Sequence, residues 1–98
     1  MTETYTSGSW IVKPGEEAAF VAAWEAAVAW AAEMPGALTF RLARDSENPR
    51  HYLSFGEWDS FEAQNAWKEQ PEFRDRIGVV LAHCDEFTPA VFELVSRI

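Results

Sequence analysis

The sequence has little cysteine and little positive charge, and each shortage excludes a class of protein. Cys84 is the only cysteine in 98 residues. No disulfide can therefore form within the chain, and we expect a reducing compartment, the cytoplasm. The chain carries 8 Lys and Arg residues against 16 Asp and Glu residues, a net charge of −8. Nucleic acid and anionic membrane surfaces are therefore not expected partners.

Long apolar runs are missing as well. The most apolar stretch, residues 18–32, contains Glu25 and is shorter than the roughly 20 residues of a membrane span. Residues 1–9 have neither the basic region nor the apolar core of a secretion signal. No repeat, linker or low-complexity segment interrupts the chain, so we expect one soluble domain over residues 1–98.

The common motifs of catalysis and metal binding are also absent. The sequence has no phosphate-binding glycine loop, no zinc-protease motif and no nucleophile elbow. Its 2 histidines and single cysteine cannot close a zinc site, so we expect no metal. His83 and Cys84 are adjacent, and neighbouring helical side chains point about 100° apart, so they do not suit a base and nucleophile pair. We expect Cys84 to be buried and unreactive.

The residue patterns predict the element order β-α-β-β-α-β. Predicted strands cover residues 6–13, 37–44, 51–58 and 90–98, and predicted helices cover residues 16–34, 60–70 and 72–84, the last two separated at Pro71. Two crossover helices around a hairpin indicate an α+β, ferredoxin-like antiparallel sheet with its helices on one face.

One apolar stripe marks the buried side of the first predicted helix. Phe20, Trp24, Ala27 and Ala31 share a face at helical spacing. Trp30 lies beside this stripe, and we expect it to face a flank, such as a partner or the rim of a pocket.

The predicted sheet is apolar on both faces. The third strand places Leu53 and Phe55 on one side and Tyr52 and Trp58 on the other, and residues 91–98 are apolar in both directions. The helices cover one face only. We therefore expect a homodimer that forms through the other sheet face and the C-terminal strand.

Aromatic residues are the one abundant feature, at 14% of the chain with 5 Trp. Trp67 precedes the break at Pro71, where an interrupted helix leaves room for a ligand. Gln64 and Asn65 lie within one turn of Trp67. Apolar walls with a few amides suit a planar, weakly polar ligand. The other expected binding residues are Trp10, Trp24, Trp58, Phe73 and His83. Each ring also suits a plain core, which is the favoured interpretation for Phe73.

The run of residues 52–63 (YLSFGEWDSFEA), followed by Ala66-Trp67 and Pro71-Glu72-Phe73, resembles the antibiotic biosynthesis monooxygenase family. The resemblance extends over nearly the whole chain and includes Lys13-Pro14-Gly15 and Pro35-Gly36-Ala37. It implies ferredoxin-like dimers whose sheets close into a barrel, in agreement with the two-faced strands.

The resemblance implies different chemistry in different branches of the family. In the quinone-forming branch, which oxidises polyphenols with O₂ and no cofactor, the Trp at the place of Trp67 pairs with an Asn one turn earlier. That position is Ala63 here. In the haem-degrading branch, the same Trp is accompanied by a His ten residues on, here Ile77, and by an Asn in the first strand, here Gly8-Ser9. Haem binding is therefore the less favoured hypothesis.

We accordingly expect a small monooxygenase that oxidises an aromatic or polyketide-like substrate with O₂ and without a cofactor. Trp67, Gln64 and Asn65 are the candidate catalytic residues. The alternative is a non-catalytic ligand-binding or accessory dimer of the same fold. Aldehyde-processing and orphan members of the family also exist, so the resemblance does not name the substrate.

Overall fold

The protein folds into four strands and three helices, described by a computed structural model over residues 3–98. Met1 and Thr2, the first two of the nine residues in which no secretion signal was expected, lie outside the described residues. The elements are β1 (Thr4–Val12), α1 (Glu17–Ala31), β2 (Ala37–Arg44), β3 (His51–Trp58), α2 (Phe61–Lys68), α3 (Phe73–Leu81) and β4 (Cys84–Glu93). Their order confirms the predicted one, with the second helical region divided into α2 and α3.

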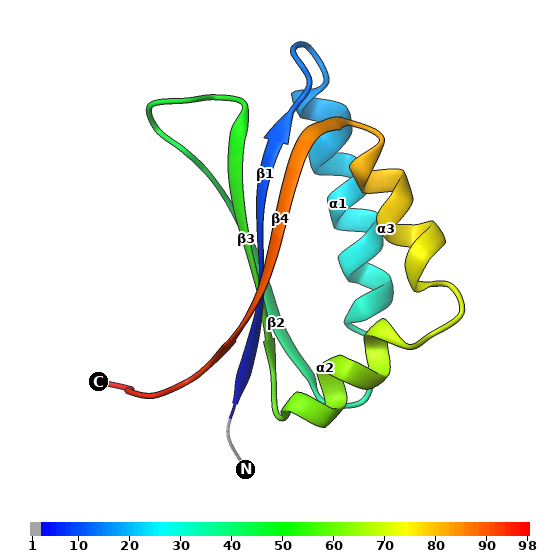
Figure 1. Ribbon diagram of the computed structural model, residues 1–98, viewed down its shortest axis with the longest axis vertical. Helices are drawn as coiled ribbons and strands as arrows, with labels where there is room; N and C mark the ends of the chain where they lie inside the picture. Colours follow the sequence, from blue (N-terminus) through cyan, green and yellow to red (C-terminus); the bar gives the residue numbers. More distant parts are fainter. Residues whose placement is uncertain (1–2) are drawn as a thin grey trace.

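The sheet is antiparallel, with strand order β2-β3-β1-β4. The helices lie together on one of its faces, and the other face is left open (Figure 1). This arrangement confirms the predicted ferredoxin-like α+β class. Within residues 3–98, no helix is both long enough and apolar enough to cross a membrane.

Turn chemistry and the apolar stripe together position α1. Gly15 and Gly36, on either side of the helix, have φ of +83° and +87°, a backbone region that suits glycine. The four stripe residues, Phe20, Trp24, Ala27 and Ala31, are all buried as predicted.

Trp30, by contrast, does not face a flank. Its ring is buried, with its centroid 6.3 Å from that of Trp67, and the Arg76 guanidinium lies 4.9 Å above it. The prediction for Trp30 was wrong because α2 and α3 cover the side of α1 that the stripe alone leaves open.

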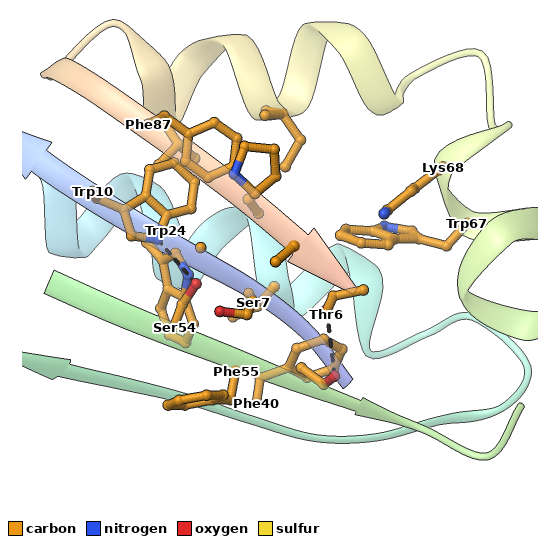
Figure 2. Close-up of a pocket in the computed structure, with 18 of the residues that line it drawn as sticks. Thr6, Ser7, Trp10, Trp24, Phe40, Ser54, Phe55, Trp67, Lys68 and Phe87 are labelled. Carbon is orange, nitrogen blue, oxygen red and sulfur yellow. Dashed lines mark hydrogen bonds between the residues drawn. The ribbon is translucent and has the colours of Figure 1, made fainter. Parts of the chain in front are cut away.

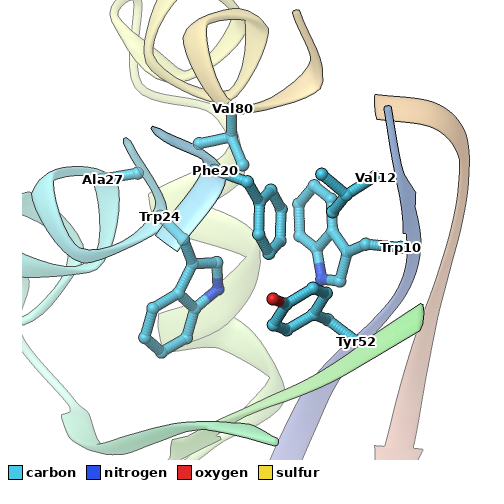
Figure 3. Packing of buried hydrophobic residues seen from close by; sticks show 7 residues of the cluster. All are labelled: Trp10, Val12, Phe20, Trp24, Ala27, Tyr52 and Val80. Carbon is cyan, nitrogen blue, oxygen red and sulfur yellow. The ribbon is translucent and has the colours of Figure 1, made fainter. Parts of the chain in front are cut away.

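Two groups of buried side chains form the core. The first is Trp10, Val12, Phe20, Trp24, Ala27, Tyr52 and Val80 (Figure 3). The second is Trp30, Ala31, Trp58 and Trp67. All 5 Trp residues are buried, each at most 9% exposed, so the indoles supply a large share of the apolar surface of the core.

The last strand differs from its prediction. It begins at Cys84 and ends at Glu93, and Pro89 lies inside it opposite Gly8. Thr88-Pro89 therefore does not end an element. Proline is tolerated there because β4 is an edge strand, where one row of N–H groups needs no partner. Residues 94–98, predicted as strand, lie beyond it.

Candidate functional site

A cavity of about 320 Å³ lies between the sheet and the helices, and small residues on the inner face of the sheet create it. Thr6 is paired with Gly56, and Gly8 with Ser54. A Cβ atom added at Gly8 would lie 2.7 Å from Trp10 Nε1, and one at Gly56 would lie 2.6 Å from Thr6 Oγ1. The two glycines therefore let neighbouring side chains lie close against the backbone, and no large side chain rises from the middle of β1 and β3 into the space beneath the helices.

The walls of this cavity are mainly aromatic (Figure 2). They include Trp10, Trp24, Phe40, Trp67, Phe73 and Phe87. Trp10 and Phe87 are stacked, with centroids 4.1 Å apart, and Trp67 meets Phe73 edge to face at 4.9 Å. Packed rings of this kind hold their positions and present flat surfaces, which suits a planar apolar ligand.

Few polar groups reach the cavity. The Ser54 hydroxyl accepts a hydrogen bond from Trp10 Nε1 at 2.9 Å, so it also orients that indole. Thr6 donates to the Gly56 carbonyl at 3.3 Å. Lys68 lines the cavity from the last turn of α2, and burial lowers the pKa of its amine. Lys68 is thus the one charged side chain among the residues that line the cavity.

Four of the sequence-predicted site residues line the cavity: Trp10, Trp24, Trp67 and Phe73. Trp58 does not line it. Its ring is stacked on Trp67, with centroids 5.1 Å apart, and thus supports the wall from behind. Their roles in ligand binding remain predictions.

The other predicted residues lie outside the cavity lining. Gln64 is 1% exposed, and its Oε1 has no hydrogen-bond partner among residues 3–98, as is also true of Nε1 of Trp58 and Trp67. A buried polar atom without a partner costs about 1–3 kcal/mol, so these three atoms favour a bound water or a ligand hydroxyl nearby, because either can accept from an indole N–H and donate to Oε1. Asn65 points to solvent. His83 contacts Glu16 through Nδ1 at 2.9 Å.

Cys84 is half-buried, with its thiol 3.7 Å from the Val80 carbonyl. Burial raises the pKa of this thiol, which keeps it protonated and poorly nucleophilic. This agrees with an unreactive cysteine. Within residues 3–98, no three His, Cys, Asp or Glu side chains gather as a metal site would require.

The site residues that sequence reasoning missed are Gly8, Ser54, Gly56 and Lys68. The first three share one signal: small residues recur at every second position, Thr6 and Gly8 before Trp10 in β1, and Ser54 and Gly56 between Tyr52 and Trp58 in β3. Alternation places such residues on the face toward the helices, so they mark a hollow. Lys68 has a weaker signal, as an isolated cation directly after Trp67.

The open face of the sheet carries apolar and polar groups. Leu53, Phe55 and Phe92 are exposed there. His51 joins Ser9 to Asp45, with contacts of 3.0 Å at Nε2 and 2.9 Å at Nδ1. These two hydrogen bonds link the loop between β2 and β3 to β1, and the hydrogen bond from His51 lowers the pKa of Asp45.

The antibiotic biosynthesis monooxygenase profile matches residues 8–77, which is most of the chain and includes 13 of the 19 residues that line the cavity. The chain belongs to this family. Among curated proteins, no sequence matches the chain.

Several solved structures share the fold. SnoaB, a cofactor-independent oxygenase from Streptomyces nogalater, superposes with a TM-score of 0.90 at 19% identity, covering 100% of this chain and 98% of SnoaB. An antibiotic biosynthesis monooxygenase gives a TM-score of 0.78 at 18% identity, covering 95% of this chain and 99% of its own. A conserved protein from Methanosarcina mazei gives 0.83 at 15% identity, covering 94% and 92%.

Proposed function

We propose that this protein is a cofactor-independent monooxygenase that oxidises a hydroxylated aromatic or polyketide-like compound with O₂. The observation that carries the proposal is the aromatic cavity of about 320 Å³, a volume within the range of small-molecule sites. Membership of the family and the likeness to SnoaB, a cofactor-independent oxygenase, support it further.

In the proposed reaction the substrate itself supplies the electrons. A hydroxyarene with a C–H group para to its hydroxyl takes up one oxygen atom of O₂ at that carbon and becomes a quinone. The second oxygen atom leaves as water, with the hydrogens of the O–H and C–H groups. Atoms and electrons then balance between the substrate and O₂, and no external reductant enters.

The protein would contribute orientation and a dry environment. Trp24 and Trp67 offer flat walls to the ring, and their packing fixes the direction from which O₂ meets it. A water-poor cavity strengthens any charge interaction with the developing anion. Of the two amides, Gln64 is the better candidate, because it is buried three residues before Trp67 and its Oε1, which has no partner among residues 3–98, can accept a hydrogen bond from a substrate hydroxyl.

Oxygen uptake with a panel of hydroxynaphthalenes and anthrones tests the proposal, combined with identification of the quinone product. We expect Trp67→Phe to lower kcat/KM about tenfold, equivalent to about 1.4 kcal/mol. Trp30→Phe is the matched control, because Trp30 is a buried Trp of the same core group that does not line the cavity. Turnover that is unchanged in both Trp67→Phe and Gln64→Ala would refute the assignment of the site.

The alternative, a binding or accessory protein, predicts a different outcome. Ligands would quench Trp fluorescence with normal affinity, and Trp67→Phe would weaken that binding. No member of the panel would consume O₂. Binding without oxygen uptake across the panel therefore favours the alternative.

We also propose that two copies pair through the open sheet face. Phe92 is 53% exposed on this face, and Phe55 of β3 lies on the same face on the other side of β1. Val95 and Ile98 extend the apolar surface beyond β4. Light scattering should give a dimer that Phe92→Lys converts to a monomer, whereas Val79→Lys, at an equally exposed position on α3, should leave it intact.

A further inference from the structure

Lys68 occupies an unusual position for a lysine. It is half-buried at the end of α2, and its side chain extends toward the cavity beside Trp67 (Figure 2). The chain contains only one other lysine, Lys13, which does not line the cavity.

The Lys68 ammonium also lacks a counter-charge. Arg50 pairs with Asp85 and Arg97 with Glu3, whereas Lys68 takes part in no ion pair within residues 3–98. Other basic residues also lack an ion pair there, but none of them lines the cavity. Acidic residues outnumber basic ones by 16 to 8, so carboxylates are plentiful elsewhere on the chain. Desolvation is the only cause that shifts the pKa of this amine, and it lowers it. A partly desolvated cation without a partner costs free energy that an anionic ligand would recover.

We propose that Lys68 binds the ionised oxygen of the ligand, so that the cavity selects phenolates over neutral arenes of the same shape. The inference rests on the proposed function, which identifies the cavity as the substrate site, and it further specifies that the substrate binds as an anion. The apolar rings would hold the arene, and the ammonium would donate a charge-assisted hydrogen bond to its oxygen. The simpler alternative, in which the Lys68 charge only interacts favourably with the helix dipole at the C-terminal end of α2, predicts no discrimination between charged and neutral ligands.

This placement has a chemical consequence for the substrate. A cation beside a phenol favours its ionised form, so the O–H bond breaks on binding and its proton goes to solvent. The electron pair stays on the ring oxygen. A phenolate gives up an electron to O₂ more readily than the neutral phenol, so binding and activation would be one event at Lys68.

Two probes of nearly equal shape separate charge from fit: 4-nitrophenol, whose phenolate absorbs visible light, and its neutral methyl ether, 4-nitroanisole. Calorimetric titration of the full chain would measure both affinities, and the visible band would report the ionisation of the bound phenol. A hydrogen bond to a charged group contributes about 1.5–3 kcal/mol, so Lys68→Met should weaken 4-nitrophenol binding about 10- to 100-fold. Binding of 4-nitroanisole should hardly change.

Two further variants guard against a general loss of structure. Lys68→Arg keeps the charge and should retain the preference for 4-nitrophenol. Lys13→Met removes the same charge outside the cavity lining and should bind both probes like the wild type. Equal effects of Lys68→Met on the two probes, or no effect on either, would overturn the inference.

Oxygen uptake separates this inference from the proposed function. A protein that binds 4-nitrophenol through Lys68 but consumes no O₂ with any hydroxyarene supports the inference and contradicts the monooxygenase assignment. Uptake that is unchanged in Lys68→Met contradicts the inference and leaves the assignment in place.

Discussion

Substituting Ser54 by alanine tests how the cavity wall is held in place. Ser54 is 8% exposed and Trp10 is 4% exposed, and the hydroxyl accepts the indole N–H at 2.9 Å. The substitution removes one oxygen atom and little volume, so it creates almost no packing defect. Its main effect is to leave a buried N–H donor without its acceptor.

A donor left unsatisfied in this way costs about 1–3 kcal/mol. The lower value applies if a water enters the adjoining cavity and accepts from Trp10 Nε1, because a bridging water replaces most of the lost bond. The upper value applies if that end of the cavity stays dry. For a domain of this size, each 1 kcal/mol corresponds to a fall of about 4–8 °C in Tm.

Urea denaturation followed by Trp fluorescence and circular dichroism measures the loss. Protein concentrations must be matched, because a dimer makes the apparent stability depend on concentration. Trp10→Phe and the double variant complete a cycle, in which the serine and the indole should couple by about 1 kcal/mol. A Ser54→Ala protein as stable as the wild type, or strictly additive effects, would show that the bond does not hold the wall.

Three further predictions concern stability. Asp45→Asn should cost stability near neutral pH but not at about pH 2. The hydrogen bond from His51 lowers the pKa of Asp45 in the folded state. The Asp45 carboxylate therefore stabilises the fold above the ordinary carboxyl pKa, and this stabilisation is lost as the pH falls through the lowered pKa. Lys68→Met should abolish the part of the rise in stability toward high pH that comes from this amine, because desolvation lowers its pKa and the folded state therefore disfavours the proton. Ser60→Ala should cost about 1 kcal/mol in urea denaturation, because the Ser60 hydroxyl caps α2 by accepting from Ala63 N at 3.1 Å.

Regular patterns predicted most of the fold. Alternation separated Tyr52 and Trp58 from Leu53, and the structure buries the first two and exposes Leu53. Helical spacing placed Trp24 on one stripe with Phe20, and both are buried. The predictions erred where two patterns overlap. Cys84 continues the apolar spacing of α3, so the spacing predicts a helix that reaches Cys84. The structure instead ends α3 at Leu81 and begins β4 at Cys84. Pro89 then suggested a break, because an edge strand cannot be identified before the strand order is known.

The site was harder to predict because an empty space defines it. The large aromatic residues were evident in the sequence, but their rings alone do not distinguish a wall from a filled core. Trp24 and Trp30 illustrate this, since both are buried and only Trp24 lines the cavity. What distinguishes them is the small inner side of β1 and β3 opposite, at Gly8 and Gly56.

The same small residues link stability to function. A core that leaves about 320 Å³ open forgoes dispersion contacts that larger side chains at Gly8 or Gly56 would make, if the neighbouring rings could move aside. Stability alone would favour filling this space, and the core clusters on either side show that the chain has ample apolar side chains to do so. The cavity also holds a lysine without a counter-charge, which again costs stability. Two unfavourable features at one place favour a bound ligand, because a flat, anionic molecule would compensate for both of them at once.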